Sequence, residues 1–419
     1  MSADNSKILV VGGGISGLTA AIEAAESGAQ VIITEREPYL GGRVAQLHRY
    51  FPKLCPPTCG LEIQFRRIRE NPRITFHTMA EVTQVTGSAG DFEVTVQVRP
   101  RYVNDRCVAC DACAQACPAW RVNDFNYGLD KTKAAYLPYD LAFPQKYVID
   151  MSACTGDCGQ KCAEACEYEA IDLGMQPQTF TYNVGAIVLA GGWELYDVSK
   201  VETLGSGQVK NVISNMQMER LAASNGPTQG KILRPSDNQP PKKVAFVQCA
   251  GSRDENHLPY CSYICCMASL KQSLYLREQY PESEATVFYI DLRTPGRYEQ
   301  FMWKARDDEG INLIRGKVAK LEQQAGTANV VATVEDTITG RKFKETFDMV
   351  VLAAGMVPTT KNTPFPMPLS YTPEGFVIPE LLPEGVFAVA SMKSPLDVMK
   401  SNEDATGAAL KSLISLSRR

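Results

Sequence analysis

Short apolar runs that end in small residues recur along the chain and predict buried strands. The first run, 7–11, leads through glycines into an alanine-rich helical segment, and the run over 30–35 ends in an acidic residue. Two later runs, 184–192 and 347–355, have the same character, and a further one lies over 385–392. Such strands, alternating with helices, predict an α/β fold.

The glycines after the first strand have the spacing of a dinucleotide-binding turn. Gly12 permits a tight turn, Gly14 lets the backbone approach a pyrophosphate, and Gly17 brings the helix close to the strand. The start of the helix would face the phosphates. Glu35, about twenty residues further on, is expected to accept a hydrogen bond from a ribose hydroxyl. A glycine turn that binds nothing is the alternative, and the strand–turn–helix context disfavours it.

A second glycine pair favours FAD over NAD. The segment Leu40-Gly-Gly-Arg43 resembles the second phosphate-side motif of flavoproteins with two dinucleotide-binding domains, the thioredoxin-reductase-like class. The runs over 184–192 and 347–355 are similar to the strands by which such proteins return to the flavin domain. The segment 385–392 is similar to their flavin-contacting strand, with Ser391 and Met392 in place of the usual Gly-Asp pair. The resemblance implies further FAD-binding residues: Arg36, Gly42, Arg43, Ala190, Gly191, Gly355 and Ser391.

Composition and charge narrow the classes of function. The 419 residues are 44% hydrophobic, enough for a large core in two or three domains. The 43 basic and 47 acidic residues leave a formal charge of −4, without the long basic run of a nucleic-acid-binding protein. The start of the chain has no export-signal pattern, and no apolar stretch approaches the eighteen or so residues that span a bilayer. We expect a soluble, cytoplasmic protein that does not bind nucleic acid.

Fourteen cysteines in a chain without an export signal indicate metal or redox chemistry. Cys107, Cys110, Cys113 and Cys117, the last followed by Pro118, have the spacing of bacterial ferredoxins. In those proteins three thiolates hold one [4Fe–4S] cluster and the fourth crosses to another. A zinc site, usually built from two separated pairs, and four purely structural cysteines explain this spacing less well.

A second group of cysteines recurs at every fourth residue: Cys154, Cys158, Cys162 and Cys166. This interval would also place them on one face of a helix, although Gly156 weakens a helix there. Crossed ligation assigns one cluster to Cys107, Cys110, Cys113 and Cys166, and the other to Cys117, Cys154, Cys158 and Cys162. Because flavin-domain strands lie on both sides, residues 99–180 are predicted to form an inserted ferredoxin-like α+β module.

The strand predicted over 244–248 lies where a pyridine-nucleotide flavoprotein has its second glycine fingerprint. Only Gly251 follows it closely, so NAD(P)H binding is not expected. In place of the fingerprint stand four cysteines: Cys249, Cys261, Cys265 and Cys266. From spacing alone they could be buried small residues, a vicinal disulfide, a catalytic thiol pair or cluster ligands.

These cysteine segments resemble those of the flavin-bearing A subunit of heterodisulfide reductases. The resemblance covers nearly the whole chain and is carried by 101–107, 134–138, 226–230, 248–253 and 260–271. It implies that Cys249, Cys261, Cys265 and Cys266 ligate a third [4Fe–4S] cluster near the flavin. It also implies that Lys271 faces the isoalloxazine as a catalytic residue, where a cation tunes the flavin. An exposed helix lysine is the alternative.

Within this family the chain most resembles the A subunit of the quinone-interacting membrane-bound oxidoreductase complex, because the extensions of the methanogen form are missing. That resemblance implies a relay of electrons between the menaquinone pool and adenylylsulfate reductase in dissimilatory sulfate reduction. The implied partners are a second flavin/iron–sulfur subunit, a membrane quinone-reactive subunit that attaches the chain peripherally to the inner membrane, and the soluble reductase. The alternatives are a subunit of a sulfur-oxidising heterodisulfide-reductase-like complex and a pyridine-nucleotide disulfide oxidoreductase.

The last two cysteines, Cys55 and Cys59, could join a further cluster or form a redox dithiol, and their role stays open.

The predicted domain order begins and ends with flavin-binding segments. The boundaries are 1–98 for the first part of the FAD domain, 99–180 for the insert, 181–240 for a return strand and linker, 241–345 for a second dinucleotide-binding-like domain, and 346–419 for the last part of the FAD domain.

Overall fold

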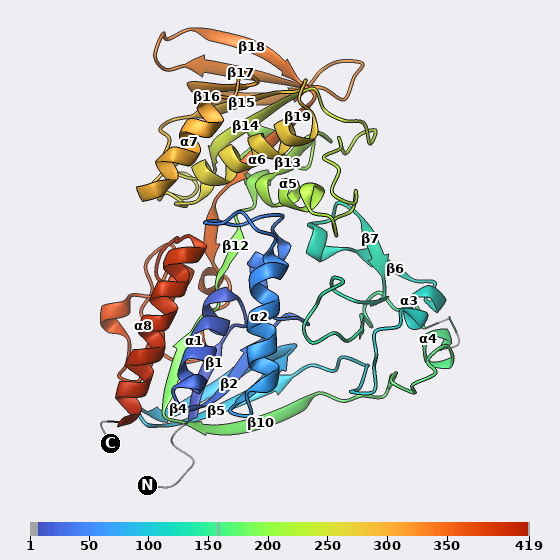
Figure 1. Ribbon diagram of the computed structural model, residues 1–419, viewed down its shortest axis with the longest axis vertical. Coiled ribbons are helices and arrows are strands. Elements are labelled where there is room, and N and C mark those ends of the chain that lie inside the picture. Colours follow the sequence, from blue (N-terminus) through green and yellow to red (C-terminus); the bar gives the residue numbers. More distant parts are fainter. Residues whose placement is uncertain (1–6, 157, 159, 418–419) are drawn as a thin grey trace. The chain divides into compact units, whose positions relative to one another are not determined.

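The computed structural model describes residues 7–156, 158 and 160–417, which fall into two compact units (Figure 1). Unit 1 comprises Met1–Trp193, Pro358–Ser394 and Val398–Arg419, and unit 2 comprises Glu194–Val357 and Pro395–Asp397. The chain passes between them in β12 (Trp193–Leu195) and β20 (Met356–Pro358), which pair with each other.

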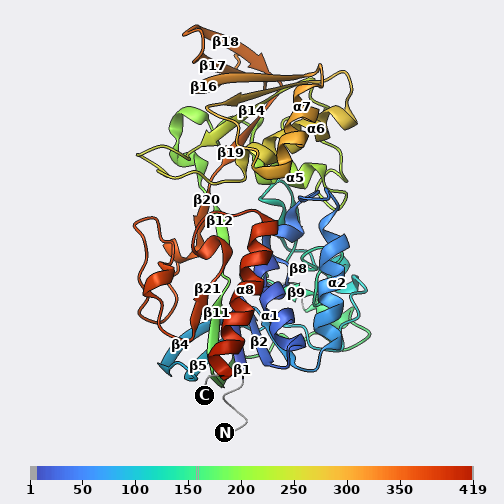
Figure 2. The same cartoon turned by 60° about the vertical axis from the view of Figure 1, so that its left-hand side comes forward.

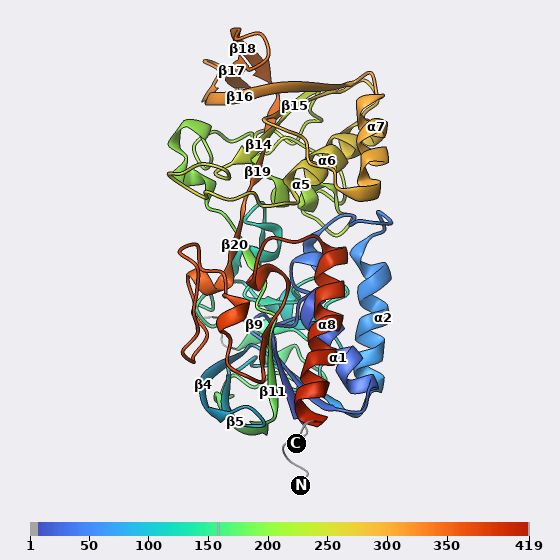
Figure 3. The same cartoon turned by 90° about the vertical axis from the view of Figure 1, so that its left-hand side faces the viewer.

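A parallel five-stranded sheet forms the centre of unit 1. Its order is β21-β11-β1-β2-β3, built from β21 (Val386–Ala388), β11 (Ala186–Leu189), β1 (Lys7–Val11), β2 (Gln30–Glu35) and β3 (Ile74–Thr78). Figure 3 shows the helices α1 (Ile15–Glu26), α2 (Pro57–Glu70) and α8 (Val398–Ser417) along one side of it.

Alternating side chains of the sheet enter two different cores, as the period of a strand requires. Ile8 and Val10 pack with the apolar residues of α1, whereas Leu9 packs with Val94 and Val96. The latter two belong to an antiparallel sheet of β4 (Ala80–Ser88), β5 (Asp91–Val98) and β10 (Gln178–Val184). Figure 2 shows this sheet on the other side from α1 and α2. The parallel sheet is therefore covered on both faces, as expected of a flavin-binding α/β layer.

The cysteine-rich insert of unit 1 departs from and returns to the antiparallel sheet at one point. Val98, the last residue of β5, pairs with Gln178, the first of β10. The intervening chain forms small elements: α3 (Ala112–Ala116), β6 (Trp120–Val122), β7 (Lys131–Lys133), β8 (Ala135–Tyr136), β9 (Val148–Ile149) and α4 (Lys161–Glu164). Their shared core contains Cys113, Cys117 and Cys162 together with Val103 and Ile149. The module also packs against the core beside α1, to which it contributes Phe125, Tyr139 and Phe143.

Unit 2 is built on a seven-stranded sheet of order β13-β19-β14-β15-β16-β17-β18. The strands are β13 (Val212–Ser214), β14 (Lys243–Ala250), β15 (Glu284–Tyr289), β16 (Ile311–Gln323), β17 (Val330–Asp336), β18 (Lys342–Phe347) and β19 (Met349–Ala354). The helices of this unit are α5 (Asn215–Ala222), α6 (Cys265–Gln279) and α7 (Glu299–Arg306).

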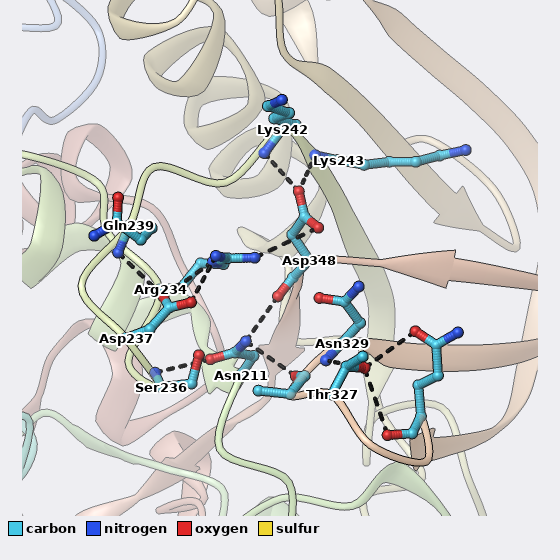
Figure 4. A network of polar contacts seen from close by, with 12 residues as sticks. Asn211, Arg234, Ser236, Asp237, Gln239, Lys242, Lys243, Thr327, Asn329 and Asp348 are labelled. Atoms are coloured by element: carbon cyan, nitrogen blue, oxygen red, sulfur yellow. Dashed lines mark hydrogen bonds and ion pairs between the residues drawn. The ribbon is translucent and has the colours of Figure 1, made fainter.

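The carboxylate of Asp348 fastens the start of β14 to the start of β19 (Figure 4). It accepts hydrogen bonds from the backbone N–H groups of Lys242 at 2.7 Å and Lys243 at 3.0 Å. Its backbone carbonyl accepts from the side chain of Asn211 at 2.9 Å, and Asn211 accepts from the N–H of Ser236 at 3.0 Å. The proline-rich segment before β14 is thereby tied to the sheet rather than left as a loose linker.

The chain crosses between the units at different places from those predicted. The sequence predicted boundaries at 240/241 and 345/346, whereas the main ones lie at 193/194 and 357/358, and Pro395–Asp397 also belongs to unit 2. The run over 347–355 contains β19, which lies between β13 and β14 in the second sheet instead of returning to the flavin sheet. An apolar parallel strand has the same sequence pattern in either sheet, so periodicity does not identify the sheet it joins.

Among the residues that the structure describes, no helix combines the length and the apolar character required to cross a bilayer.

Candidate functional site

Of the three glycines in the turn after β1, one has free space where a side chain would be, so the packing of the protein does not require a glycine there. A Cβ on Gly12 would lie 2.2 Å from the carbonyl oxygen of Ala190, and a Cβ on Gly17 would lie 1.8 Å from that of Gly12. A Cβ on Gly14 would meet only the Cα of Gly42, at 3.9 Å. Gly14 is the N-cap of α1, whose first turn receives no side-chain cap and carries no acidic residue. Open backbone and helix N–H groups at this point fit a pyrophosphate.

Glu35 ends β2 with a buried carboxyl group beside this turn. Its Oε2 accepts from the N–H of Gly13 at 2.6 Å, and its Oε1 accepts from the N–H of Glu37 at 2.8 Å. Burial raises the pKa of Glu35 to about 7, although both hydrogen bonds oppose the rise. Each carboxylate oxygen keeps a lone pair that a ribose hydroxyl could use. Arg36 is partly buried and pairs with Glu37 at 3.6 Å.

The second glycine pair brings Arg43 into the same region. The N–H of Gly41 donates to the carbonyl of Gly13 at 2.8 Å, and Gly42 has a left-handed φ of 55°. Arg43 donates to the carbonyl oxygen of Trp193 at 3.2 Å and to the hydroxyl of Tyr127 at 3.0 Å. Tyr127 belongs to the cysteine-rich insert, so the insert contacts the flavin turn directly.

Residues that follow β11 and β21 complete the candidate FAD site in unit 1. The N–H of Ala190, just after β11, donates to the carbonyl of Val11 at 2.7 Å. A Cβ on Gly191 would lie 2.9 Å from the Oγ1 of Thr359 and 3.1 Å from the Sδ of Met392. Ser391 is buried in the 3-10 turn Ala390–Met392 that follows β21. Gly12, Glu35, Ala190, Gly191 and Ser391 therefore lie at the carboxyl ends of neighbouring strands, where open α/β sheets bind ligands.

Gly355 follows β19 and belongs to unit 2 rather than to unit 1. A Cβ on Gly355 would lie 2.4 Å from the Oγ of Ser252 and 2.8 Å from that of Ser262. Those hydroxyls are themselves 2.9 Å apart. The missing side chain makes room for the loop that carries Cys249 and Cys261.

The first cysteine group of the insert gathers four thiols from two chain segments. Cys107, Cys110, Cys113 and Cys166 line one pocket with Val108 and Tyr168. Burial, together with the neighbouring thiols of Cys107, Cys166 and Cys110, raises the pKa of the Cys113 thiol to about 12. The N–H of Ala170 donates to the Sγ of Cys166 at 3.3 Å. These four are the residues that crossed ligation assigns to one cluster.

The second group forms around the buried thiol of Cys162, at the start of the short helix α4. Burial raises the pKa of Cys162, and the thiols of Cys158, Cys117 and Cys154 contribute to the rise. Cys117 comes from the end of α3, which packs against α4. Cys117 is therefore close to the second group although the sequence places it with the first.

The third group surrounds the start of α6 in unit 2. The pairing of β14 with β19 shifts register between Val247 and Ala250, and Cys249 within this bulge has a φ of 56°. Cys265 and Cys266 are the first residues of α6. Burial and the thiols of Cys249, Cys266 and Cys261 all raise the pKa of Cys265. Beside this group, the buried amide of Gln248 has no hydrogen-bond partner within the described part of the chain.

The chemistry of all three groups fits iron–sulfur clusters. Crowded thiols resist ionisation unless a cation stabilises the thiolates, and cluster iron supplies that charge. Within residues 7–156, 158 and 160–417, no three His, Cys, Asp or Glu side chains converge as they would around a single metal ion. The four thiolates of a [4Fe–4S] cluster each bind a different iron and therefore stand wider apart than the ligands of one ion.

Lys271 is buried in unit 2 and is not the exposed helix lysine considered as its alternative. Its Nζ lies 3.1 Å from the Oε1 of Glu219 on α5, and the two side chains are 6% and 2% exposed. Gln272 also donates to Glu219, at 2.7 Å. Lys271 is thus part of a buried polar group between α5 and α6.

Three contacts near the candidate site residues could not be predicted from any pattern in the sequence. Tyr127 reaches Arg43 across 84 residues, and Asp291 reaches Arg253 across 38. Tyr50 lies over the start of α2, where a Cβ on Gly60 would be 2.3 Å from its hydroxyl. Burial, Cys59 and Cys55 together raise the pKa of Tyr50, so both cysteines lie near one tyrosine.

Comparison with known proteins places the flavin turn within a family match and identifies relatives of the whole chain. The FAD-dependent oxidoreductase family matches residues 7–70, which include the glycine turn, Glu35 and Arg43. An iron–sulfur A subunit of the CoB–CoM heterodisulfide reductase of Methanopyrus kandleri is 38% identical over 98% of this chain and 64% of its own length. The A subunit of the ferredoxin/F420H2-dependent CoB–CoM heterodisulfide reductase of Methanosarcina acetivorans is 40% identical over 86% of this chain and 46% of its own length. This chain therefore spans between about half and two thirds of the relatives it matches.

Solved structures identify the fold. Thioredoxin reductase of Lactococcus lactis superposes with a TM-score of 0.54, covering 99% of this chain and all of its own, at 13% identity. Bacillithiol disulfide reductase of Bacillus cereus superposes with a TM-score of 0.53, covering 99% of each chain at 13% identity. The chain thus has the fold of thioredoxin-reductase-like FAD oxidoreductases, and its sequence relatives are A subunits of heterodisulfide reductase.

Proposed function

We propose that this chain is an oxidoreductase subunit that binds FAD and three [4Fe–4S] clusters and relays electrons within a heterodisulfide-reductase-like complex. The observation that carries the proposal is the crossed grouping of the insert cysteines: Cys166 lines the pocket of the first group, and Cys117 lies beside the second. This exchange of ligands is the ferredoxin arrangement for two clusters side by side. Such a pair serves electron transfer more readily than storage of a single metal.

The flavin, when bound, supplies a carrier that exchanges electrons singly with clusters and in pairs with other partners. The chain positions it through the open backbone at Gly14, the carboxyl of Glu35 and the guanidinium of Arg43. Arg43 donates at 3.0 Å to Tyr127 of the insert, so one contact aligns the flavin turn with the cluster module. The cysteine thiols would hold the clusters. Backbone N–H groups donate to cysteine sulfurs, as the N–H of Ala170 does to the Sγ of Cys166 at 3.3 Å.

Reduction by NAD(P)H is disfavoured by the end of β14 and the start of α6. In a nucleotide-binding unit this place holds a glycine turn that admits a pyrophosphate. Here the bulge carries Cys249, and Cys265 and Cys266 occupy the first turn of the helix. The pyridine-nucleotide disulfide oxidoreductase alternative would therefore need a second nucleotide site for which the described residues provide no glycine turn.

The finer assignment follows the sequence resemblance to the A subunit of the quinone-interacting membrane-bound oxidoreductase. In this proposal the chain works with two partner subunits, one carrying flavin and iron–sulfur clusters and one reacting with quinone in the membrane. It links the menaquinone pool to adenylylsulfate reductase. A subunit of a sulfur-oxidising heterodisulfide-reductase-like complex is the competing assignment. The relatives named above are subunits of heterodisulfide reductases, which supports assembly into a complex in either case.

The composition of the isolated chain tests the cofactor proposal. Anaerobic purification should yield one FAD and roughly twelve iron atoms per chain, as expected for three four-iron clusters. Electron paramagnetic resonance of the reduced protein should resolve more than one cluster signal. An iron content near four, with every cysteine present, would refute the proposal of three clusters.

Electron donors and acceptors test the relay. The chain with its co-purifying subunits should pass electrons to adenylylsulfate reductase in the presence of a menaquinol analogue, or accept electrons from the reductase in the presence of a menaquinone analogue. It should oxidise NADH and NADPH only slowly. Rapid turnover with NAD(P)H and the chain alone would favour the disulfide oxidoreductase instead. Exchange of electrons with sulfane-sulfur carriers in place of the reductase would favour the sulfur-oxidising complex.

A further inference from the structure

An acid in unit 2 holds two arginines beside the third cysteine group. The carboxylate of Asp291, just after β15, lies 2.5 Å from Arg253 and 3.4 Å from Arg293, one guanidinium on each oxygen. Arg253 follows Cys249 by four residues on the loop that leads to Cys261. The three side chains join the cysteine loop to the segment after β15.

The arginine pair reaches the thiols through Asp291. The Sγ of Cys266 donates to the backbone carbonyl of Asp291 at 3.6 Å. Arg253 lies on the loop between Cys249 and Cys261 and is held by the carboxylate of the same Asp291. Both guanidinium groups are therefore attached to a residue that contacts one of the four thiols.

The charges act in the same direction. Two guanidinium groups and one carboxylate leave a net charge of +1 beside the group. The start of α6, where Cys265 and Cys266 lie, adds the positive end of a helix dipole.

A cluster in this position gains one negative charge when it is reduced. Nearby cations and hydrogen bonds to its sulfurs stabilise the more negative state and so raise its reduction potential. Arg253 is 26% exposed and Arg293 is 49% exposed, so solvent screens the charge of Arg253 less. The larger effect is expected from Arg253.

We propose that Arg253 and Arg293, held by Asp291, are positioning residues that raise the reduction potential of the cluster bound by Cys249, Cys261, Cys265 and Cys266. The proposal rests on the proposed function for the existence of that cluster.

A redox titration of the complete chain, followed by electron paramagnetic resonance, tests the proposal. The signal of the third cluster is identified as the one that Cys249→Ser alters. In Arg253→Gln the ratio of reduced to oxidised cluster at the wild-type midpoint should fall about tenfold, a shift of about 59 mV to more negative potential for one electron. Arg293→Gln should shift it in the same direction by less, and Arg253→Lys should recover part of the loss because the charge remains.

Arg341→Gln is the matched control. This exposed arginine lies next to β18 at the far edge of the sheet from β14, so its loss should leave every potential unchanged. An unshifted third signal in both Arg253→Gln and Arg293→Gln would overturn the inference, as would an equal shift of all clusters. Absence of any signal sensitive to Cys249→Ser in the wild-type chain would instead contradict the proposed cofactor content.

Discussion

The guanidinium of Arg43 donates a hydrogen bond of 3.0 Å to the hydroxyl of Tyr127, and that hydroxyl donates to the side chain of Gln46 at 2.7 Å. Arg43 and Gln46 belong to the turn after the second glycine pair, whereas Tyr127 belongs to the cysteine-rich insert. One tyrosine thereby fixes the residue proposed to meet the flavin phosphates.

Replacement of this tyrosine tests the contact. Tyr127→Phe removes a hydrogen bond to a charged group and should weaken FAD binding about fivefold, or ~1 kcal/mol, because Arg43 loses its fixed orientation. The measurement is the dissociation constant of FAD from the reconstituted protein. Trp120→Phe changes an exposed ring of the same insert and should leave it unaltered. An unchanged constant in Tyr127→Phe would show that Arg43 is held by its other partners.

The glycine turn offers a matched pair of substitutions. Gly14→Ala should fold and lose most of its FAD, because the added Cβ meets only Gly42 within the protein, at 3.9 Å, and projects toward the proposed pyrophosphate. Gly17→Ala should destabilise the fold itself by about 3 kcal/mol or more, because its Cβ would lie 1.8 Å from a carbonyl oxygen. Circular dichroism and flavin absorbance after gel filtration separate the two. Full flavin content in Gly14→Ala would mean that the phosphates bind elsewhere.

The buried carboxyl of Glu35 predicts a pH dependence of stability. Its folded pKa of about 7 exceeds the ordinary value of 4.5, so between these values the folded chain binds more protons than the unfolded chain. The stabilisation is complete below pH 4.5 and is lost as the pH rises through 7, with a total of ~3 kcal/mol. Urea unfolding of the flavin-free protein between pH 5.5 and 8 should show this fall.

Glu35→Gln should remove that part of the pH dependence, and Glu37→Gln, its exposed neighbour, should keep it. A stability that rises with pH across this range in the wild type, or the same slope in Glu35→Gln, would contradict the assignment.

Crossed ligation in the insert is testable with single serine substitutions. Cys117→Ser should alter the same paramagnetic signal as Cys158→Ser, and Cys166→Ser should alter the same signal as Cys110→Ser, because the thiols group in this way. The measurement is the spectrum of each reduced variant at several temperatures. If Cys117→Ser and Cys110→Ser perturb one signal and leave the other intact, the cysteines follow their order in the sequence instead.

The pair of Lys271 and Glu219 is the most deeply buried ion pair of unit 2 among the described residues. Glu219→Gln should destabilise the protein by about 3 kcal/mol, because it leaves a buried ammonium without its carboxylate, and adding Lys271→Met should recover part of the loss. Chemical denaturation measures both. The exposed pair of Lys320 and Glu322 provides the control, since Glu322→Gln should cause no measurable change. An equal effect of both glutamate substitutions would contradict a special role for the buried pair.

What the sequence predicts well is local. The turn from Gly12 to Gly17 is a pattern within about twenty residues, and so is each cysteine spacing. The fold class follows from such short patterns. The sheet that a strand joins is not local: the run over 347–355 ends like a flavin-domain strand, yet β19 pairs with β13 and β14. The bulge at Cys249 and the contact from Tyr127 to Arg43 depend on pairings made across the fold, and no short pattern encodes them.

The pairing of Val98 with Gln178 has a consequence for how such a chain could arise. Because the insert departs and returns at facing residues of one antiparallel ladder, a tight hairpin could close the two strands in its absence. The cluster-bearing insert is in this sense an addition to the connection between β5 and β10, two strands that already pair with each other. The strand order of the underlying flavoprotein would be the same with or without the cluster-bearing insert.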